Sequence, residues 1–219
     1  MLETSAIIFD LDGVLADSSV VVDHAWIEWG DRHGIDPGLI RQTIPGKRTR
    51  DSIALLAPES DVEAEAARIT AREQSLVDFV TPIRGAGALL AQLPAGSWGV
   101  ATSGTDAIAR SRLAHAGLPV PDVLISADMV RRGKPDPEVY LRAAAGLGVD
   151  ATACMVFEDA PSGVLAARAT GATVVGVLTW AERSLLQVTY AVKDLRAVHV
   201  TALGRRLRVE LHDPEPART

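Results

Sequence analysis

The chain has 219 residues, 47% of them hydrophobic and 23% charged, a composition typical of a soluble globular protein rather than a disordered one. Its formal net charge of −6 disfavours a nucleic-acid-binding protein, because such proteins normally carry a basic stripe. No apolar stretch approaches the roughly 18 residues of a membrane span, and the N-terminus lacks the pattern of a leader peptide. We therefore expect a cytoplasmic protein that binds neither nucleic acid nor membrane, with a monomer as the default.

Short apolar runs alternate with helical patterns over most of the chain. Runs rich in β-branched or small residues predict strands buried on both faces at Ala6–Phe9, Trp98–Ala101, Cys154–Phe157 and Thr173–Leu178. Helical patterns occur at Asp106–Ala116, Glu138–Gly146 and Pro161–Thr170. This alternation predicts an α/β fold with a doubly wound parallel sheet. The single cysteine, Cys154, lies in an apolar run and is expected to be a buried thiol.

Residues 20–80 differ from the rest because they contain successive helical patterns and no convincing buried strand. The clearest helix is EAEAARITAREQSLVDF, and a cluster of proline and glycine at residues 81–87 ends the segment. We predict a core domain of residues 1–18 and 82–219, interrupted by a helical cap domain of residues 19–81. The polar, proline-containing residues 212–219 are expected to form a frayed tail.

Polar residues follow three of the predicted strands. They are Asp10 and Asp12 after the first, Thr102, Ser103 and Gly104 after the second, and Glu158 and Asp159 after the third. In a doubly wound sheet these positions share one crevice beyond the carboxyl ends of the strands. Lys134 lies in the loop RRGKPDPE, which proline and glycine keep out of regular structure. The expected site therefore contains two carboxylate pairs, hydroxyl groups and one lysine.

Electrostatic repulsion makes such a cluster costly unless something compensates for it. Two carboxylates about 4 Å apart repel by roughly 4 kcal/mol at an effective dielectric constant of about 20. Either a bound proton or a divalent cation can offset this repulsion, and a set of oxygen ligands favours Mg²⁺ over zinc. A bound Mg²⁺ typically leaves positions for phosphate oxygens, so the cluster is compatible with phosphoryl chemistry.

The remaining polar residues fit a phosphoryl group. Thr102 and the backbone amides of Ser103 and Gly104 can donate to phosphoryl oxygens near a helix N-terminus, and Lys134 can neutralise charge. One aspartate can then attack phosphorus while the other acts as general acid and base. Each residue also has an ordinary explanation, as a helix cap or a solvated side chain. Their joint placement at strand and loop ends favours the functional interpretation.

Four motifs in chain order resemble those of haloacid dehalogenase superfamily phosphatases. They read FDLDGVL, VATSGT, GKPDP and VFEDAPSG. The resemblance extends from about residue 7 to 177 and implies a Rossmann-like core with a helical cap. It implies Asp10 as nucleophile, Asp12 as acid and base, and Thr102 and Lys134 as phosphoryl stabilisers. It also implies a Mg²⁺ site made of Asp10, Asp12 through its carbonyl, Glu158 and Asp159.

The resemblance also implies a type of reaction and a class of substrate. Haloacid dehalogenases carry no aspartate equivalent to Asp12, whereas phosphatases do, because an alkoxide leaving group needs a proton. The segments LPAGSWGVATSGT, MVFEDAPSGVLAA and PGKRTRDSI are most similar to glycerol-3-phosphate and 2-deoxyglucose-6-phosphate phosphatases. A small phosphorylated metabolite, a sugar or polyol phosphate, is implied as substrate. We predict that its far end contacts the cap loop of Gly46, Lys47, Arg48 and Thr49, although a basic loop can also be merely solvated.

Two alternatives remain open. The family also contains β-phosphoglucomutase, whose cap carries a histidine that assists attack by a substrate hydroxyl. Val22 takes that position here and His24 lies on a different helical face, so transfer to water is preferred. A non-enzymatic sensor of phosphorylated metabolites is the other alternative. Trp26 and Trp29, three residues apart, are expected to pack in the cap core rather than to form a sugar platform.

Overall fold

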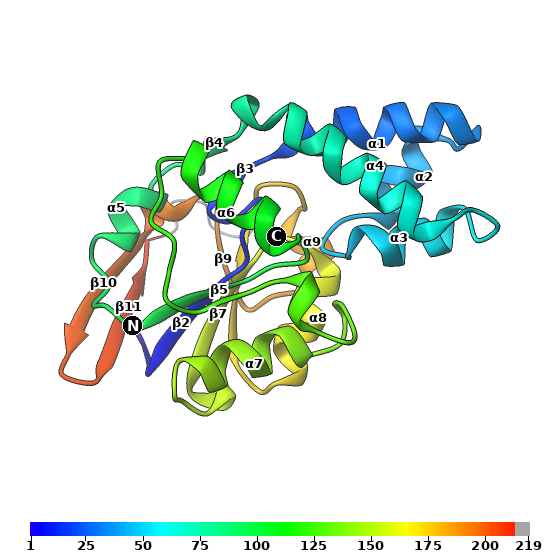
Figure 1. Ribbon diagram of the computed structural model, residues 1–219. Coiled ribbons are helices and arrows are strands. Elements are labelled where there is room, and N and C mark those ends of the chain that lie inside the picture. Colours follow the sequence, from blue (N-terminus) through cyan, green and yellow to red (C-terminus); the bar gives the residue numbers. More distant parts are fainter. Residues whose placement is uncertain (213–219) are drawn as a thin grey trace.

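The computed structural model of the protein describes residues 1–212 (Figure 1). Its strands are β1 (Leu2–Thr4), β2 (Ala6–Phe9), β3 (Ala16–Asp17), β4 (Thr81–Pro82), β5 (Trp98–Ala101), β6 (Leu124–Ile125), β7 (Cys154–Glu158), β8 (Thr173–Val177), β9 (Tyr190–Val192), β10 (Val198–Leu203) and β11 (Arg206–Leu211). Its α-helices are α1 (Ser19–His33), α2 (Pro37–Thr43), α3 (Thr49–Leu56), α4 (Val62–Ser75), α5 (Ala86–Leu90), α6 (Asp106–His115), α7 (Glu138–Gly146), α8 (Pro161–Ala169) and α9 (Arg183–Leu186). Among the described residues, no helix is long and apolar enough to cross a bilayer. Of the predicted tail, residues 213–219 lie outside the described part of the chain.

The central sheet consists of parallel strands in the order β6-β5-β2-β7-β8-β9. Strand β2 lies between β5, where Ile7 pairs with Trp98, and β7, where Ile7 pairs with Met155. The chain therefore continues to one side of β2 with β5 and β6, and to the other side with β7, β8 and β9. Ligands of doubly wound sheets bind beyond the strand ends at such a switch point. The predicted α/β fold is confirmed, and the seven predicted elements agree with the structure to within one residue at each end.

Different helices cover the two faces of this sheet. Side chains alternate along a strand, so Ile7 and Phe9 of β2 point to one face while Ala6 and Ile8 point to the other. The first face packs against α5 and α6, and the second against α7 and α8. All four β2 residues are buried, which explains why the strand reads as a continuous apolar run.

Capping side chains determine where several helices begin. Asp36 accepts a hydrogen bond from the backbone N–H of Leu39 at the start of α2, and Asp61 accepts one from Ala64 at the start of α4. Thr105 caps α6 in the same way, through the N–H of Ile108 at 3.3 Å. Such caps satisfy backbone donors that have no partner within the helix. The cap of α6 fixes the turn that follows β5 and leads into this helix.

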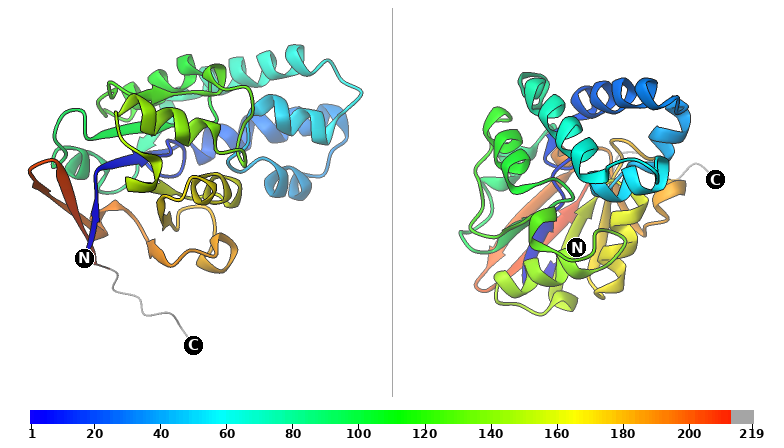
Figure 2. Two further views of the ribbon diagram at one scale, coloured as in Figure 1. Left: turned by 90° about the horizontal axis from the view of Figure 1, so that it is seen from below. Right: turned by 45° about the vertical axis from the view of Figure 1, so that its right-hand side comes forward.

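Helices α1–α4 form a separate layer at one end of the molecule, remote from the hairpin of β10 and β11 (Figures 1 and 2). They have a hydrophobic cluster of their own, to which Trp26, Trp29, Ile40, Ile53 and Ile69 contribute. Trp26 and Trp29 pack edge to face with ring centroids 5.4 Å apart. Both tryptophans therefore lie in the core of this helical layer, as expected from their spacing.

A small antiparallel sheet in the order β1-β11-β10 is absent from the sequence-based predictions. Its hairpin turns at Gly204, where φ is 62°. The segments VHVTAL and RLRVEL alternate apolar and polar residues, a pattern typical of a half-buried hairpin. The apolar side chains Val200, Leu207 and Val209 pack onto the sheet face that also carries α5. The signal for this sheet was present in the sequence and was overlooked.

Candidate active site

Three carboxylates meet where neighbouring strands end. Asp10 directly follows β2, and Glu158 and Asp159 stand at the end of β7. The backbone N–H of Asp10 donates to the carbonyl of Phe157 at 2.9 Å, which joins the two strand ends. Carboxylate oxygens of the three residues lie within 4.8 Å of one another, and all three side chains are buried. The structure thus brings together three of the acidic residues that the sequence analysis grouped.

Lys134 supplies positive charge to this cluster. Its Nζ donates to Asp10 Oδ1 and to Glu158 Oε1, both at 2.7 Å, and its side chain is fully buried. The Tyr140 ring lies 5.0 Å from Nζ and adds a cation–π contact. Burial lowers the pKa of Lys134, but Asp10 and Glu158 raise it by more, so the amine stays charged. Lys134 is therefore a fixed cation beside Asp10.

Glu158 is held by protein donors at both of its oxygens. Oε1 accepts from Lys134 and from the Tyr140 hydroxyl at 2.7 Å, while Oε2 accepts from the backbone N–H groups of Asp159 and Ala160. Of the predicted metal ligands, this carboxylate is the one most occupied by protein contacts. Its geometry suits it to orient Lys134 and the loop that carries Asp159.

The cluster concentrates negative charge in a buried space. Burial raises the pKa of Asp10 from 3.8 to about 7, with Glu158 and Asp12 acting in the same direction and Lys134 opposing them. Burial and the charges of Glu158 and Asp10 also raise the pKa of Asp159 well above its ordinary value. One lysine does not balance three carboxylates, so the site favours additional bound protons or a bound cation.

The residues present fit a hard divalent cation such as Mg²⁺. The donor atoms are carboxylate oxygens, which suit Mg²⁺ and not a metal that prefers sulfur or imidazole. Asp10 and Asp159 both line the pocket and can ligate directly. The backbone carbonyl of Asp12, two residues after Asp10, is the further ligand that the motif implies. The chemistry and the spacing of the donor set therefore agree with the predicted metal.

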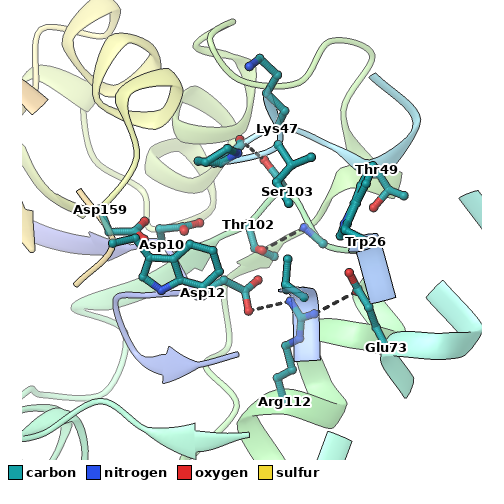
Figure 3. Close-up of a pocket in the computed structure, with 16 residues that line it drawn as sticks. Asp10, Asp12, Trp26, Lys47, Thr49, Glu73, Thr102, Ser103, Arg112 and Asp159 are labelled. Carbon is teal, nitrogen blue, oxygen red and sulfur yellow. Dashed lines mark hydrogen bonds and ion pairs between the residues drawn. The ribbon is translucent and has the colours of Figure 1, made fainter. Parts of the chain in front are cut away.

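Asp12 is oriented away from the other carboxylates. Its Oδ1 accepts a hydrogen bond from Ser18 Oγ at 2.7 Å and pairs with Arg112 Nη1 at 2.6 Å. Arg112 in turn contacts Glu73 of α4 through Nη2 at 2.9 Å (Figure 3). The side chain of Asp12 lines the pocket but is not part of the group of close carboxylates. Any metal contact of Asp12 thus falls to its backbone, and its carboxylate stands apart from the acidic cluster.

The turn after β5 forms the opposite side of the site. Thr102 is buried, and its Oγ1 accepts from the backbone N–H of Gly104 at 3.0 Å. Ser103 Oγ donates to the carbonyl of Gly46 at 2.7 Å, so this turn contacts the helical layer directly (Figure 3). Thr102, Ser103 and Gly104 all line the pocket, so the structure places them beside Asp10 and Asp159.

The loop 46–49 divides between the pocket and the protein interior. Gly46, Lys47 and Thr49 line the pocket. Arg48 does not: its guanidinium binds both carboxylate oxygens of Asp51, at 2.7 and 2.8 Å, and the carbonyls of Val130 and Arg131. The planar fork of arginine suits this bidentate pairing, which uses the donors that a substrate would need. The expected contact between Arg48 and substrate therefore has no support in this geometry.

Two adjoining cavities lie between the helical layer and the sheet. The smaller, of about 90 Å³, is lined by Asp10, Asp12, Trp26, Thr102, Arg112 and Asp159, among others. A water needs about 10–15 Å³ of such space, so this cavity has room for several waters or one phosphoryl group. The larger, of about 710 Å³, shares Val22, Ile44, Pro45, Lys47, Asp159 and Trp180 with it. A phosphate ester thus has room to place its phosphoryl group in the first cavity and its organic part toward the second.

Several residues of the site escaped the sequence analysis, among them Arg112, Glu73, Tyr140 and Trp180. Arg112 lies on the buried face of α6 with Ile108, Ala109 and Leu113, and Glu73 follows Ile69 by one helical turn in α4. A charged residue within an apolar helical stripe is the signal that could have revealed both. Trp180 lies in a loop and gave no comparable signal.

Comparison with known proteins places these observations in a family. The model of the haloacid dehalogenase-like hydrolases matches residues 4–171. The chain belongs to this family. The family and the fold expected from the four motifs are thereby confirmed, and the chain is an enzyme, a phosphatase of the haloacid dehalogenase-like type.

Named relatives are similar over most of the chain. Hexitol phosphatase A of Escherichia coli (strain K12) is 38% identical over 200 residues, which cover 89% of this chain and 93% of the relative. The 2-deoxyglucose-6-phosphate phosphatase 1 of Saccharomyces cerevisiae is 33% identical over 88% of this chain and 89% of its own. The crystal structure of a β-phosphoglucomutase from Clostridium difficile aligns with a TM-score of 0.77 at 24% identity, over 88% of this chain and 92% of that one. The last similarity concerns the fold alone.

Stabilisation by Mg²⁺ should increase with pH. The pKa of Asp10 is raised to about 7, so between about pH 4 and 7 the folded metal-free protein binds a proton that the unfolded chain does not. The contribution of Asp10 to the stability of the metal-free protein therefore falls as the pH rises through this window. At low pH, Mg²⁺ must displace the proton that Asp10 carries. We expect the Mg²⁺-induced rise in melting temperature to be larger near pH 8 than near pH 5.5. Asp159→Asn should abolish the rise at both values, and a pH-independent rise would contradict this account.

Alanine at position 13 should damage the metal site. Gly13 has a φ of 79°, and a Cβ there would lie 2.0 Å from Asp159 Oδ2. Gly96 has a φ of 74° with no atom within 4 Å of an added Cβ, so Gly96→Ala reproduces the backbone strain without the collision. We expect Gly13→Ala to weaken Mg²⁺ binding at least about tenfold relative to Gly96→Ala, as measured by calorimetric titration. Equal affinities in the two variants would show that Asp159 tolerates displacement.

Proposed function

We propose that the protein is a Mg²⁺-dependent phosphomonoesterase that hydrolyses a small sugar or polyol phosphate through an aspartyl-phosphate on Asp10. The observation that carries this proposal is the small pocket lined by Asp10, Asp12 and Asp159, with Lys134 buried against Asp10 at 2.7 Å. The proposed nucleophile and the proposed acid thus line a space that can hold a phosphoryl group, and a buried cation contacts the nucleophile.

In the first step, a carboxylate oxygen of Asp10 attacks phosphorus and the bond from phosphorus to the ester oxygen breaks. The ester oxygen takes the proton carried by Asp12 and leaves as an alcohol. Lys134, Thr102 and the amides of Ser103 and Gly104 stabilise the charge on the phosphoryl oxygens. Thr102, Ser103 and Gly104 already line the pocket, whereas the Gly104 amide would have to exchange its bond to Thr102 Oγ1 for one to the phosphoryl group.

In the second step, Asp12 takes a proton from a water molecule, whose oxygen attacks phosphorus. The bond between phosphorus and Asp10 breaks, so inorganic phosphate leaves and both aspartates return to their starting protonation states. Mg²⁺, held by Asp10, Asp159 and the carbonyl of Asp12, would neutralise carboxylate and phosphoryl charge. Glu158 would support it by fixing Lys134 and the backbone of Asp159.

The proposed substrate class rests on the pocket and on the relatives. Lys47, Thr49, Glu73 and Ser103 surround the pocket with groups that can bind hydroxyls. The relatives named above act on a hexitol phosphate and a deoxysugar phosphate. We further propose that residues 19–81 act as a cap domain that closes over this pocket and excludes bulk water. Their separate hydrophobic cluster supports this division.

A hexose-phosphate mutase is the principal alternative. Val22 lines the pocket with an apolar side chain where a mutase would need a base. His24 is mostly exposed, its Nδ1 bonds to the carbonyl of Val20, and it lines only the larger cavity. Water is therefore the acceptor that this geometry supports. Conversion of β-glucose 1-phosphate to glucose 6-phosphate in the presence of a bisphosphate activator would favour the mutase instead.

Removal of the nucleophile should abolish turnover. Asp10→Asn keeps the shape of the side chain but removes its charge, and we expect phosphate release to fall on the order of 10³-fold or more. The measurement is release of inorganic phosphate from a panel of sugar, polyol and nucleotide phosphates, with and without Mg²⁺. A variant that keeps more than about a tenth of wild-type activity would remove Asp10 from this role. A wild-type protein that releases no phosphate, yet is stabilised by these esters, would instead favour the sensor.

A further inference from the structure

Arg112 forms a buried bridge between the core and the helical layer. The residue is 4% exposed, and its guanidinium reaches Asp12 Oδ1 at 2.6 Å with Nη1 and Glu73 Oε2 at 2.9 Å with Nη2. Asp12 belongs to the loop after β2, whereas Glu73 belongs to α4 (Figure 3). One side chain of α6 thus contacts both the predicted acid and base and the predicted cap.

A purely structural role explains this bridge poorly. A buried ion pair contributes little net stability, because desolvation of the charges offsets their attraction. Burial acts to lower the pKa of Arg112, yet Asp12 and Glu73 raise it by more, so the group stays charged. The bridge also lies in the wall of the pocket, where an apolar side chain would avoid this desolvation. A role in the reaction gives a reason for placing these charges there.

Both side-chain contacts of Asp12 involve residues that are connected to the helical layer. Ser18, which binds Oδ1, directly precedes α1, the first helix of that layer. Arg112, which binds the same oxygen, is itself held by Glu73. Both donors bind Oδ1, which leaves Oδ2 to exchange a proton with the ester oxygen. If the helical layer moves away, Arg112 loses one of its two carboxylate partners, Glu73.

We propose that Arg112 is a positioning residue that holds Asp12 ready for proton transfer and, through Glu73, makes this orientation depend on cap closure. The proposal rests on the proposed phosphatase function. The two aspartates then differ in what orients them. The core alone orients Asp10, whereas Asp12 is fully oriented only when α4 is in place. Lysine is not equivalent at position 112, because a single ammonium group cannot reproduce two nitrogens directed at two carboxylates.

The test compares two esters that differ in their need for a proton. The alkoxide of glycerol 1-phosphate or 2-deoxyglucose 6-phosphate, whichever the wild type hydrolyses faster, requires protonation by Asp12. The p-nitrophenolate of p-nitrophenyl phosphate leaves as a stable anion. The ratio kcat/KM reports steps up to loss of the leaving group, so later hydrolysis of the aspartyl-phosphate does not affect it. A variant that is merely less well folded loses activity toward both esters equally.

We expect Arg112→Lys to lower kcat/KM for the alkyl ester on the order of 10²-fold and for p-nitrophenyl phosphate by less than about threefold. The double variant Arg112→Met with Glu73→Gln removes one positive and one negative charge, so Glu73 is not left as an unpaired buried carboxylate. It should also lower kcat/KM for the alkyl ester much more than for p-nitrophenyl phosphate. Glu73→Gln alone should give a smaller loss on the alkyl ester. Arg110→Met, at an exposed position of the same helix that pairs only with Asp106, is the matched control and should affect neither ester.

Equal losses on both esters, or no loss on either, would overturn the positioning role while the phosphatase function stands. Absence of phosphate release by the wild type from any ester would overturn the proposed function, and this inference with it. Melting temperatures of all variants establish that each is folded under the assay conditions.

Discussion

Three carboxylates and one ammonium group share a buried space at the ends of β2 and β7, and the remaining parts of the site are arranged around that charge. Neighbouring parallel strands lie about 4.8 Å apart, so acidic residues that directly follow them cannot avoid one another. Lys134 and two backbone amides satisfy Glu158, whereas Asp10 and Asp159 are left facing the pocket. Such an arrangement costs stability, and it becomes favourable when a cation and a phosphoryl group occupy the space together. The positively polarised turn at Thr102–Gly104 then completes the enclosure of the phosphoryl oxygens.

The helical layer meets the core through polar contacts at the pocket and through Val21 of α1, which packs in a hydrophobic cluster of the core. Ser103 binds the carbonyl of Gly46, Ser162 binds that of Pro45, and Arg48 binds those of Val130 and Arg131. The hydrophobic cluster of this layer is separate from the two clusters of the core. Hydrogen bonds of this kind can exchange with water, whereas a shared apolar core would resist separation. The polar part of the interface is therefore compatible with the proposed opening and closing of the cap.

The sequence indicates which residues lie together at the sheet edge, because their positions follow from local rules. Continuous apolar runs identify strands buried on both faces, and residues directly after such strands converge at one edge of the sheet. This reasoning placed Asp10, Thr102 and Asp159 correctly without knowledge of the fold. It missed residues whose contacts depend on which helical faces meet. Arg112 and Glu73 are an example, because they pair with each other although they are 39 residues apart in sequence. It also could not foresee that Arg48 would turn inward to Asp51, because a basic loop gives no indication of which donors point to solvent.

Asp10 and Asp12 are two residues apart, yet they belong to different electrostatic neighbourhoods. Asp10 shares Lys134 with Glu158 and lies beside Asp159, all of them parts of the core. Asp12 shares Arg112 with Glu73 and is bound by Ser18, which connects it to the helical layer at two points. Two carboxylates in distinct environments can take distinct roles, as nucleophile and as proton carrier. Because only the second neighbourhood includes a residue from α4, the core alone holds the proposed nucleophile and its cation. Under the proposed mechanism, proton transfer by Asp12 requires both layers, which would link departure of the alcohol to an enclosed substrate.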